Sequence, residues 1–133
     1  MLVVDTSAVL AALAGADPTP ELIQRLQHDG DLHAPHLLDV ELLHALRGLV
    51  RGHALSADRA ADVRTDYAEL TLTRYPQDAL SDRAWELRHN LSAYDAMFVA
   101  LAEALGAPLI TCDARLATAP GITAHVELFA ALL

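Results

Sequence analysis

Short apolar runs that end next to an aspartate alternate with helix-like segments along this chain. Leu2–Val4 is an apolar run that stops at Asp5, and residues 108–111 form a second run shortly before Asp113. Between them apolar residues recur every three or four positions, as in amphipathic helices. Alternating strands and helices predict a parallel sheet covered on both faces, the α/β class. Because ligands bind beyond the carboxyl ends of parallel strands, Asp5 and Asp113 are candidate site residues.

The periodicity and the capping residues also place the individual elements. We expect strands over residues 2–4, 70–75, 108–111 and 122–126, and a loop or short strand ending at Pro35. We expect helices over residues 6–13, 20–28, 36–50, 56–69, 76–89 and 92–105, and a helical turn after Asp113. The first helix should end at Gly15, before Pro18 and Pro20. With 133 residues and no internal repeat, the chain is expected to form one domain over residues 1–133.

The composition excludes several classes of chemistry. The chain contains no lysine, which excludes a P-loop, Schiff-base catalysis and the Ser-x-x-Lys hydrolases. Its one cysteine, Cys112, allows no intrachain disulfide and favours a reducing compartment. No basic leader precedes the first strand, and charges interrupt the most apolar stretch, residues 93–110. We therefore expect a soluble cytoplasmic protein with no membrane span.

Two acidic residues follow predicted strands and precede predicted helices. Asp5 can serve simply as a helix N-cap, and so can Asp113, with Arg115 as its surface ion-pair partner. The hydroxyl of Thr111 lies two residues before Asp113 and could orient it through a hydrogen bond. The sequence leaves the structural and the functional interpretation of both aspartates open.

Two further carboxylates lie on predicted helices. Glu41 falls on the flank of an apolar helix face, where an ordinary solvated residue is the simpler interpretation. Asp95 forms a Ser-x-x-Asp capping box with Ser92, yet it shares a helix stripe with Phe98 and Val99. A carboxylate on an apolar stripe needs a donor, a proton or a cation, because burying it unpaired is costly.

A parallel α/β fold can bring these four carboxylates into one cleft. At separations of ~5 Å and an effective dielectric of ~20, their mutual repulsion would approach ~20 kcal/mol as an upper limit. A divalent cation is the natural compensation, and a set of oxygen ligands favours Mg²⁺ or Mn²⁺ over zinc. Such a site could activate water, neutralise a phosphate and stabilise a leaving oxygen, the three requirements of phosphodiester hydrolysis.

The chain also carries a family resemblance over nearly its whole length. The segments that carry this resemblance are Val4-Asp5-Thr6-Ser7-Ala8, Glu41 in a Leu-rich helix, Ser92-Ala93-Tyr94-Asp95-Ala96, and Pro108-Leu109-Ile110-Thr111-Cys112-Asp113. In this order they resemble the PIN domain, and more narrowly the VapC-type toxins of toxin–antitoxin pairs. The resemblance implies a PIN-like three-layer sandwich, in which helices flank a short, mostly parallel sheet.

The resemblance further implies an endoribonuclease that depends on Mg²⁺ or Mn²⁺, an inhibiting cognate antitoxin protein, and a homodimer. It assigns catalysis and metal binding to four acids and support to three neighbours: Asp5, Glu41, Asp95 and Asp113, then Thr6, Thr111 and Arg115. Members often carry another Asp or Asn after the position of Asp113, where this chain has residues 114–116, Ala-Arg-Leu. The number of metal ions, one or two, therefore stays open.

The charge distribution bears on an RNA substrate. A net charge of -9 argues against a nucleic-acid partner. However, the positive and negative charges of residues 47–88 cancel, so the acidity belongs to the two ends of the chain. Four arginines of this balanced middle could hold the RNA backbone or could be ordinary solvated residues: Arg47, Arg51, Arg59 and Arg64. The 53% hydrophobic fraction suggests apolar surface available to a protein partner.

Competing functions are weaker. A two-component receiver requires a lysine, and a HAD-type phosphatase requires an aspartate where this chain has Ser7. Zinc binding is disfavoured because His33 and His36 lack a cysteine pair or a second histidine motif, and we expect both to be loop residues. The serious non-enzyme alternative is a catalytically inactive PIN-like module that binds a protein or RNA.

Overall fold

A five-stranded parallel sheet forms the centre of the protein. The computed structural model describes residues 1–15 and 19–131, so the expected helix stop at Pro18 lies outside the described residues. The strands are β1 (Leu2–Val4), β2 (Leu32–Pro35), β3 (Leu72–Tyr75), β4 (Leu109–Thr111) and β5 (Val126–Leu128). Their spatial order is β3-β2-β1-β4-β5, and every neighbouring pair is parallel.

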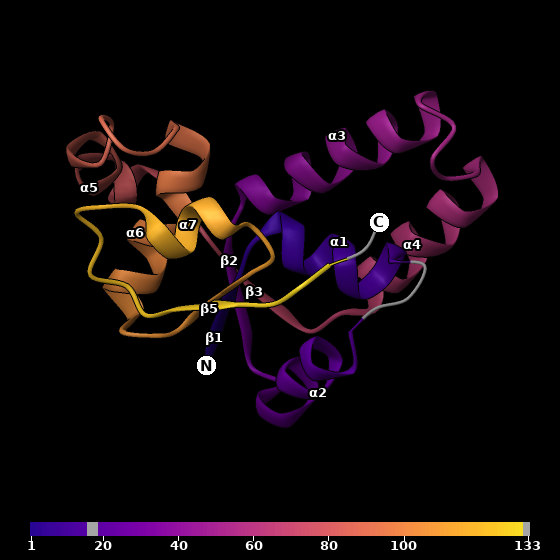
Figure 1. Ribbon diagram of the computed structural model, residues 1–133, viewed down its shortest axis with the longest axis horizontal. Coiled ribbons are helices and arrows are strands. Elements are labelled where there is room, and N and C mark those ends of the chain that lie inside the picture. Colours follow the sequence, from indigo (N-terminus) through magenta and orange to yellow (C-terminus); the bar gives the residue numbers. More distant parts are fainter. Residues whose placement is uncertain (16–18, 132–133) are drawn as a thin grey trace.

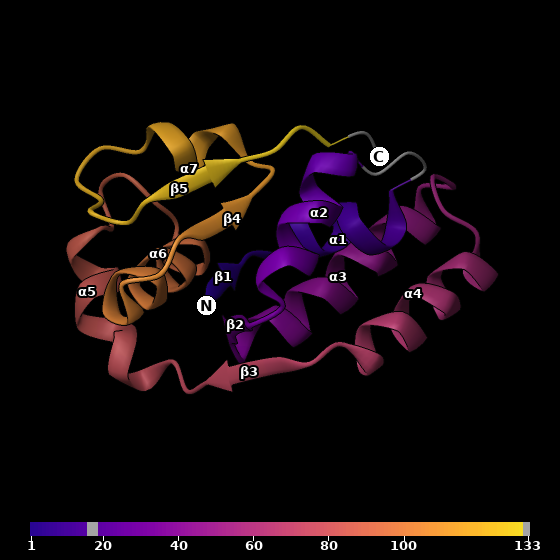
Figure 2. The same ribbon diagram turned by 90° about the horizontal axis from the view of Figure 1, so that it is seen from below.

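Helices cover both faces of this sheet. They are α1 (Thr6–Ala14), α2 (Pro20–Asp29), α3 (Leu37–Arg51), α4 (Ala57–Glu69), the 3-10 helix η1 (Asp78–Leu80), α5 (Ser81–Glu86), α6 (Ala93–Leu105) and α7 (Ala114–Thr118). Figure 1 shows α3 and α4 as a helical hairpin that extends away from the sheet. Figure 2 shows α1 and α2 on one side of the strands and α5, α6 and α7 on the other. The predicted α/β three-layer sandwich is confirmed.

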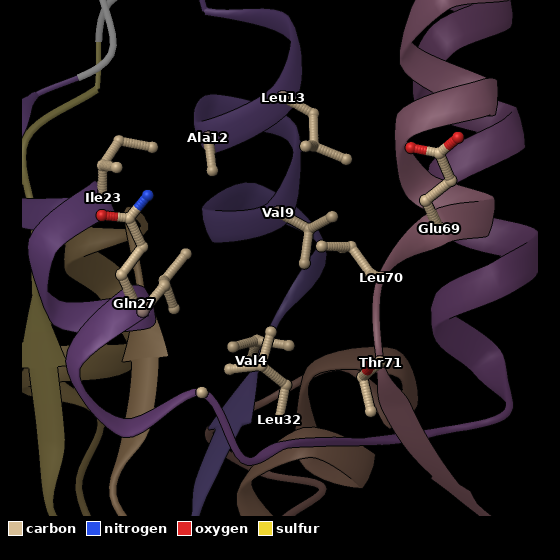
Figure 3. A pocket seen from close by; sticks show the side chains of 12 residues that line it. Val4, Val9, Ala12, Leu13, Ile23, Gln27, Leu32, Glu69, Leu70 and Thr71 are labelled. Carbon is tan, nitrogen blue, oxygen red and sulfur yellow. The ribbon is translucent and has the colours of Figure 1, made fainter.

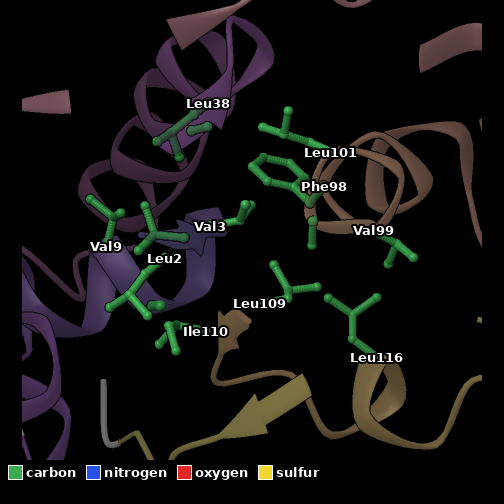
Figure 4. Packing of buried hydrophobic residues seen from close by; sticks show 14 of the residues in the cluster. Leu2, Val3, Val9, Leu38, Phe98, Val99, Leu101, Leu109, Ile110 and Leu116 are labelled. Carbon is green, nitrogen blue, oxygen red and sulfur yellow. The ribbon is translucent and has the colours of Figure 1, made fainter. Parts of the chain in front are cut away.

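The core explains why the strands are so uniformly apolar. All three residues of β1 are fully buried, because α1 and α6 cover opposite faces of the sheet and leave neither face to water. Figure 4 shows Phe98 and Leu101 of α6 among side chains of the sheet and of α3. Both are about 2% exposed and belong to one continuous core cluster. Burial on this scale fixes the strand ends that carry the candidate site.

The strand order brings the two candidate aspartates to one place. The chain adds β2 and then β3 on one side of β1, and returns to place β4 and β5 on the other side. The order therefore reverses between β1 and β4, and in open α/β sheets such a switch point opens a crevice beyond the carboxyl ends of the strands. Val4 pairs with Ile110 in the register of β1 and β4, so Asp5 and the end of β4 lie side by side.

Two predicted elements were wrong in position. The last strand was expected over residues 122–126 but begins at Val126, because Glu103 accepts the backbone N–H of Thr123 at 2.7 Å and holds that segment outside the sheet. The helix expected over residues 76–89 is a 3-10 turn followed by α5, which ends at Glu86. Beyond it, Asn90 donates a hydrogen bond to the carbonyl of Pro120, so the chain turns instead of continuing as a helix.

His33 also differs from its predicted place. It lies within β2, not in a loop, and is only 5% exposed. Its ring nitrogens bond to the Tyr75 hydroxyl of β3 at 2.7 Å and to Asp31, just before β2, at 2.8 Å, so both nitrogens of this buried histidine have partners. Within the described part of the chain, no helix is long and apolar enough to cross a membrane.

Candidate active site

Asp5 is the most buried carboxylate of the candidate site. It directly follows β1, caps α1, and accepts the backbone N–H of Ala8 at 2.9 Å through Oδ1. The Ser7 hydroxyl donates to the same oxygen at 2.7 Å, and the Thr111 hydroxyl donates to Oδ2. The Asp5 side chain is 5% exposed. The same buried carboxylate therefore caps a helix and lies at the switch point.

The environment of Asp5 works against its negative charge. Burial raises the pKa of this carboxyl above its ordinary value, and the nearby charge of Asp113 acts in the same direction. The hydrogen bonds from Thr111, Ser7 and the Ala8 amide oppose this rise because they favour the ionised form. The raised pKa means that the fold holds a carboxylate whose charge is only partly compensated.

Hydroxyl groups connect the ends of β1 and β4. Besides donating to Asp5, the Thr111 hydroxyl accepts the backbone N–H of Asp113 at 3.0 Å. Ser7 Oγ accepts the backbone N–H of Cys112 at 2.9 Å. Thr111 was expected to orient Asp113, and it does so by accepting the backbone N–H of Asp113. The proton of its hydroxyl is donated to Asp5. Ser7 was not predicted, although its place two residues after Asp5 allows this bond at a helix start.

Asp113 is bound by an arginine of its own segment. It caps α7 and accepts the backbone N–H of Arg115 at 3.0 Å. The Arg115 guanidinium also grips both carboxylate oxygens, with Nη2 at 2.7 Å from Oδ2. These contacts lower the pKa of Asp113 below its ordinary value. The predicted ion pair therefore exists, and it keeps Asp113 ionised.

Asp95 faces the same guanidinium from the other side. It lies in the first turn of α6, where its backbone N–H donates to the hydroxyl of Ser92, the N-cap. Its side chain is 31% exposed, and its Oδ2 lies 3.9 Å from Nη2 of Arg115. Burial raises the pKa of Asp95, Arg115 opposes the rise, and the charge of Asp113 adds to it. Arg115 is thus a shared counter-charge for Asp95 and Asp113.

Glu41 completes the set from α3. The hydroxyl of Thr6, at the start of α1, donates to Glu41 Oε1 at 2.7 Å. Glu41 and Asp95 line one cleft of about 360 Å³, whose other lining residues are Asn90, Leu91, Ser92, Tyr94 and Arg115. The sequence did not single out Asn90 or Tyr94 as separate site residues. The four predicted acids are therefore neighbours in a chain of contacts: Asp5 to Asp113 through Thr111, Asp113 to Asp95 through Arg115, and Asp95 to Glu41 across the cleft.

The donor set has the chemistry of a site for a hard divalent cation. All four acids offer carboxylate oxygens, the ligands that Mg²⁺ and Mn²⁺ prefer, and two of them have raised pKa values. Across residues 1–15 and 19–131, no three acidic, histidine or cysteine side chains converge on one point in this conformation. The Arg115 guanidinium lies between two of the acids, so a cation would share them with Arg115 or displace it.

An apolar cavity elsewhere in the protein has a different character. Figure 3 shows Val9 and Leu13 of α1, Ile23 of α2 and Leu70 around a cavity of about 360 Å³. The described lining contains a single acid, Glu69, and none of the four candidate carboxylates. The four candidate carboxylates therefore lie apart from this apolar cavity.

Comparison with known proteins agrees with this geometry. The sequence profile of the PIN domain matches residues 2–122. Ribonuclease VapC1 of Mycobacterium tuberculosis is 42% identical over 127 residues, which cover 95% of this chain and 96% of that protein. VapC ribonuclease Mb0985 of Mycobacterium bovis is 46% identical over 116 residues, 87% of this chain and 88% of that protein. This chain belongs to the PIN-domain family of VapC ribonucleases.

A solved structure supports the family fold independently of sequence. A toxin–antitoxin complex from Klebsiella pneumoniae contains a chain that superposes with a TM-score of 0.66 at 21% identity, covering 96% of each chain. At this identity the match speaks for the fold alone. The elements that carry the four acids of this VapC-family chain therefore belong to an arrangement shared with distant proteins.

Proposed function

We propose that this chain cleaves RNA internally by hydrolysis of phosphodiester bonds, with Asp5, Glu41, Asp95 and Asp113 binding Mg²⁺ or Mn²⁺. The observation that carries the proposal is the hydrogen-bonded junction of Asp5, Thr111 and Asp113 at the switch point. Family membership supports the activity, since relatives that are 42–46% identical are named ribonucleases. The same names disfavour the alternative of an inactive binding module.

The protein's own groups would prepare the site in distinct ways. A bound divalent cation would lower the pKa of a water molecule and would neutralise the charge of the phosphate. Asp5 is held rigid by three hydrogen bonds, so it would present its oxygens at a fixed position. Thr6 would orient Glu41, and the N-terminal turn of α6 would orient Asp95. Arg115 lies among the acids and could contact a phosphate oxygen as it releases them.

The decisive experiment is cleavage of total cellular RNA by metal-free protein, with and without Mg²⁺ or Mn²⁺, followed by mapping of new RNA ends. We expect new internal ends only when metal is added. The variants Asp5→Asn and Asp95→Asn should lose these ends while keeping the far-ultraviolet circular dichroism of the wild type. Full activity in EDTA, or in both variants, would refute the proposal.

We also propose two protein partners, a cognate antitoxin and a second copy of this chain, for a domain that acts in the cytoplasm. The fold neighbour from Klebsiella pneumoniae is a toxin–antitoxin complex, and two large apolar side chains, Trp85 and Leu128, are 68% and 48% exposed. The antitoxin should insert an arginine among the carboxylates, because Arg115 already shows that a guanidinium fits there. A protein that is monomeric at micromolar concentration, and that no co-expressed binder inhibits, would contradict both parts.

A further inference from the structure

One exposed face of α3 starts at the candidate site and leads away from it. Val40, His44, Arg47 and Arg51 recur at intervals of four, three and four residues, so they follow one stripe of the helix. All four side chains are exposed. Arg47 and Arg51 are one helical turn apart, about 6 Å along the axis. The stripe therefore begins apolar, beside Glu41, and becomes basic toward the far end of α3.

Among the residues that the structure describes, Arg47 and Arg51, like Arg64 of α4, make no side-chain hydrogen bond or ion pair, and they differ from Arg64 because they lie on the stripe that begins beside Glu41. Arg59 donates to the carbonyl of Leu13 at 2.6 Å, and Arg74 pairs with Asp39 at 2.8 Å. Over the described ranges, 1–15 and 19–131, neither Arg47 nor Arg51 lies within ion-pair distance of a carboxylate. Their guanidinium groups are available to an external anion.

A cavity connects the stripe to the carboxylates. It measures about 610 Å³ and is lined by Thr6, Leu37, Val40, Glu41, His44, Ala45 and Tyr94. Glu41 and Tyr94 also line the cleft that contains Asp95. Tyr94 is 62% exposed, so little of this large ring packs against the core. The cavity thus has a lining of apolar and polar side chains, with an exposed aromatic ring one residue from Asp95.

We propose that an unpaired RNA strand leaves the carboxylates through this cavity, with one nucleobase stacked on Tyr94 and the following phosphates bound by Arg47 and Arg51. The inference rests on the proposed function and names the residues that hold the strand beyond the carboxylates. Proteins recognise unpaired bases by stacking them on aromatic rings. Because the whole chain carries a net charge of -9, it needs a local basic path to hold a polyanion, and this stripe is continuous with the site.

Binding by the Asp5→Asn protein tests this inference without relying on cleavage. The probe is a short unstructured RNA that carries 2-aminopurine at one position, compared with the same strand in a duplex. We expect base fluorescence to change on binding, and Tyr94→Leu to abolish that change while Tyr94→Phe preserves it. Arg47→Gln and Arg51→Gln should each make the slope of log affinity against log salt less negative by about 0.7, the value for one phosphate contact on a single strand. Arg64→Gln, an exposed arginine on α4, is the matched control and should leave the slope unchanged.

The outcomes separate this inference from the proposed function. If the wild-type protein cleaves RNA but Tyr94→Leu and the two α3 variants bind like the control, the path along α3 is wrong and the proposed activity stands. If no metal restores cleavage, the proposed function fails, and the binding measurements still decide the path. Dissociation of a dimer by Tyr94→Leu, with RNA binding unchanged, would instead identify this face as a protein interface and overturn the inference.

Discussion

The Thr111 hydroxyl joins the two aspartates at the switch point, so replacing it with a methyl group tests how the site is held. Thr111 is fully buried, and Thr111→Val preserves its shape while removing the donor to Asp5 and the acceptor of the Asp113 amide. A hydrogen bond to a charged group contributes roughly 1.5–3 kcal/mol, and a buried donor left unpaired costs roughly 1–3 kcal/mol. Since the Asp113 amide is only partly buried, we expect a loss of about 3 kcal/mol in the free energy of unfolding at neutral pH. For a chain of this length that corresponds to a fall of about 10 °C in melting temperature.

The loss should depend on pH in a defined direction. Burial raises the pKa of Asp5, and the bond from Thr111 opposes that rise, so Thr111→Val should raise the Asp5 pKa further. A carboxyl with a raised pKa in the folded state contributes most favourably below its unfolded value of ~4, and that contribution declines as pH rises through the folded value. The stability difference between wild type and Thr111→Val should therefore be largest at neutral pH and shrink on acidification through the Asp5 pKa.

Urea unfolding followed by circular dichroism, at neutral and at mildly acidic pH, measures this difference. Thr111→Ser is the control, because it keeps the hydroxyl and removes one buried methyl, at a cost of about 1 kcal/mol that should not vary with pH. A loss below about 0.5 kcal/mol in Thr111→Val, or the same loss at both pH values, would refute the view that this hydroxyl stabilises the Asp5 carboxylate.

Three other expectations concern metal and charge. Asp5→Asn and Asp95→Asn should each reduce RNA cleavage about 100-fold or more, since even the outer partners of metal ligands typically contribute 10–100-fold; gel assays with circular dichroism as the folding control would show this. Because the pKa of Asp95 is raised, the Asp95→Asn protein should melt at a higher temperature than wild type at neutral pH without metal. Its melting temperature should also respond less to Mg²⁺ or Mn²⁺ in thermal scans. A lower melting temperature would mean that Asp95 mainly stabilises its helix. Arg115→Gln removes a cation that competes for Asp95 and Asp113, so calorimetric titration should show tighter Mn²⁺ binding, and unchanged affinity would argue against metal at these two acids.

Local sequence signals predicted most of the fold because they report local physics. The apolar run of β1 is buried on both faces, and Ser56, Ser92 and Gly106 end or begin helices through contacts within a few residues. The last strand was misplaced because its start depends on Glu103, which lies 20 residues away in the chain and binds the Thr123 amide. Side-chain contacts at such separations leave no periodic pattern in a sequence.

The same distinction applies to the candidate site. Asp5 and Asp113 could be found because acids after strands of a parallel sheet must gather at one edge. The bond from Thr6 to Glu41 spans 35 positions and the bond from Thr111 to Asp5 spans 106, so only the folded chain reveals them. Residue types and strand ends thus predicted which residues form the site. The hydrogen bonds that hold each of these residues could be seen only in the structure.

Arg115 gives this site a counter-charge of its own. Arg115 lies two residues after Asp113, and its guanidinium binds Asp113 and approaches Asp95. Placing a cation there relieves the repulsion that the two acids would otherwise feel, and the low pKa of Asp113 reflects that relief. Because the Arg115 side chain is 78% exposed, it can move into solvent and release both carboxylates without breaking the core. A metal ion, an antitoxin arginine and Arg115 would therefore compete for the same oxygens, and Arg115 would have to share them or move away when either of the other two binds.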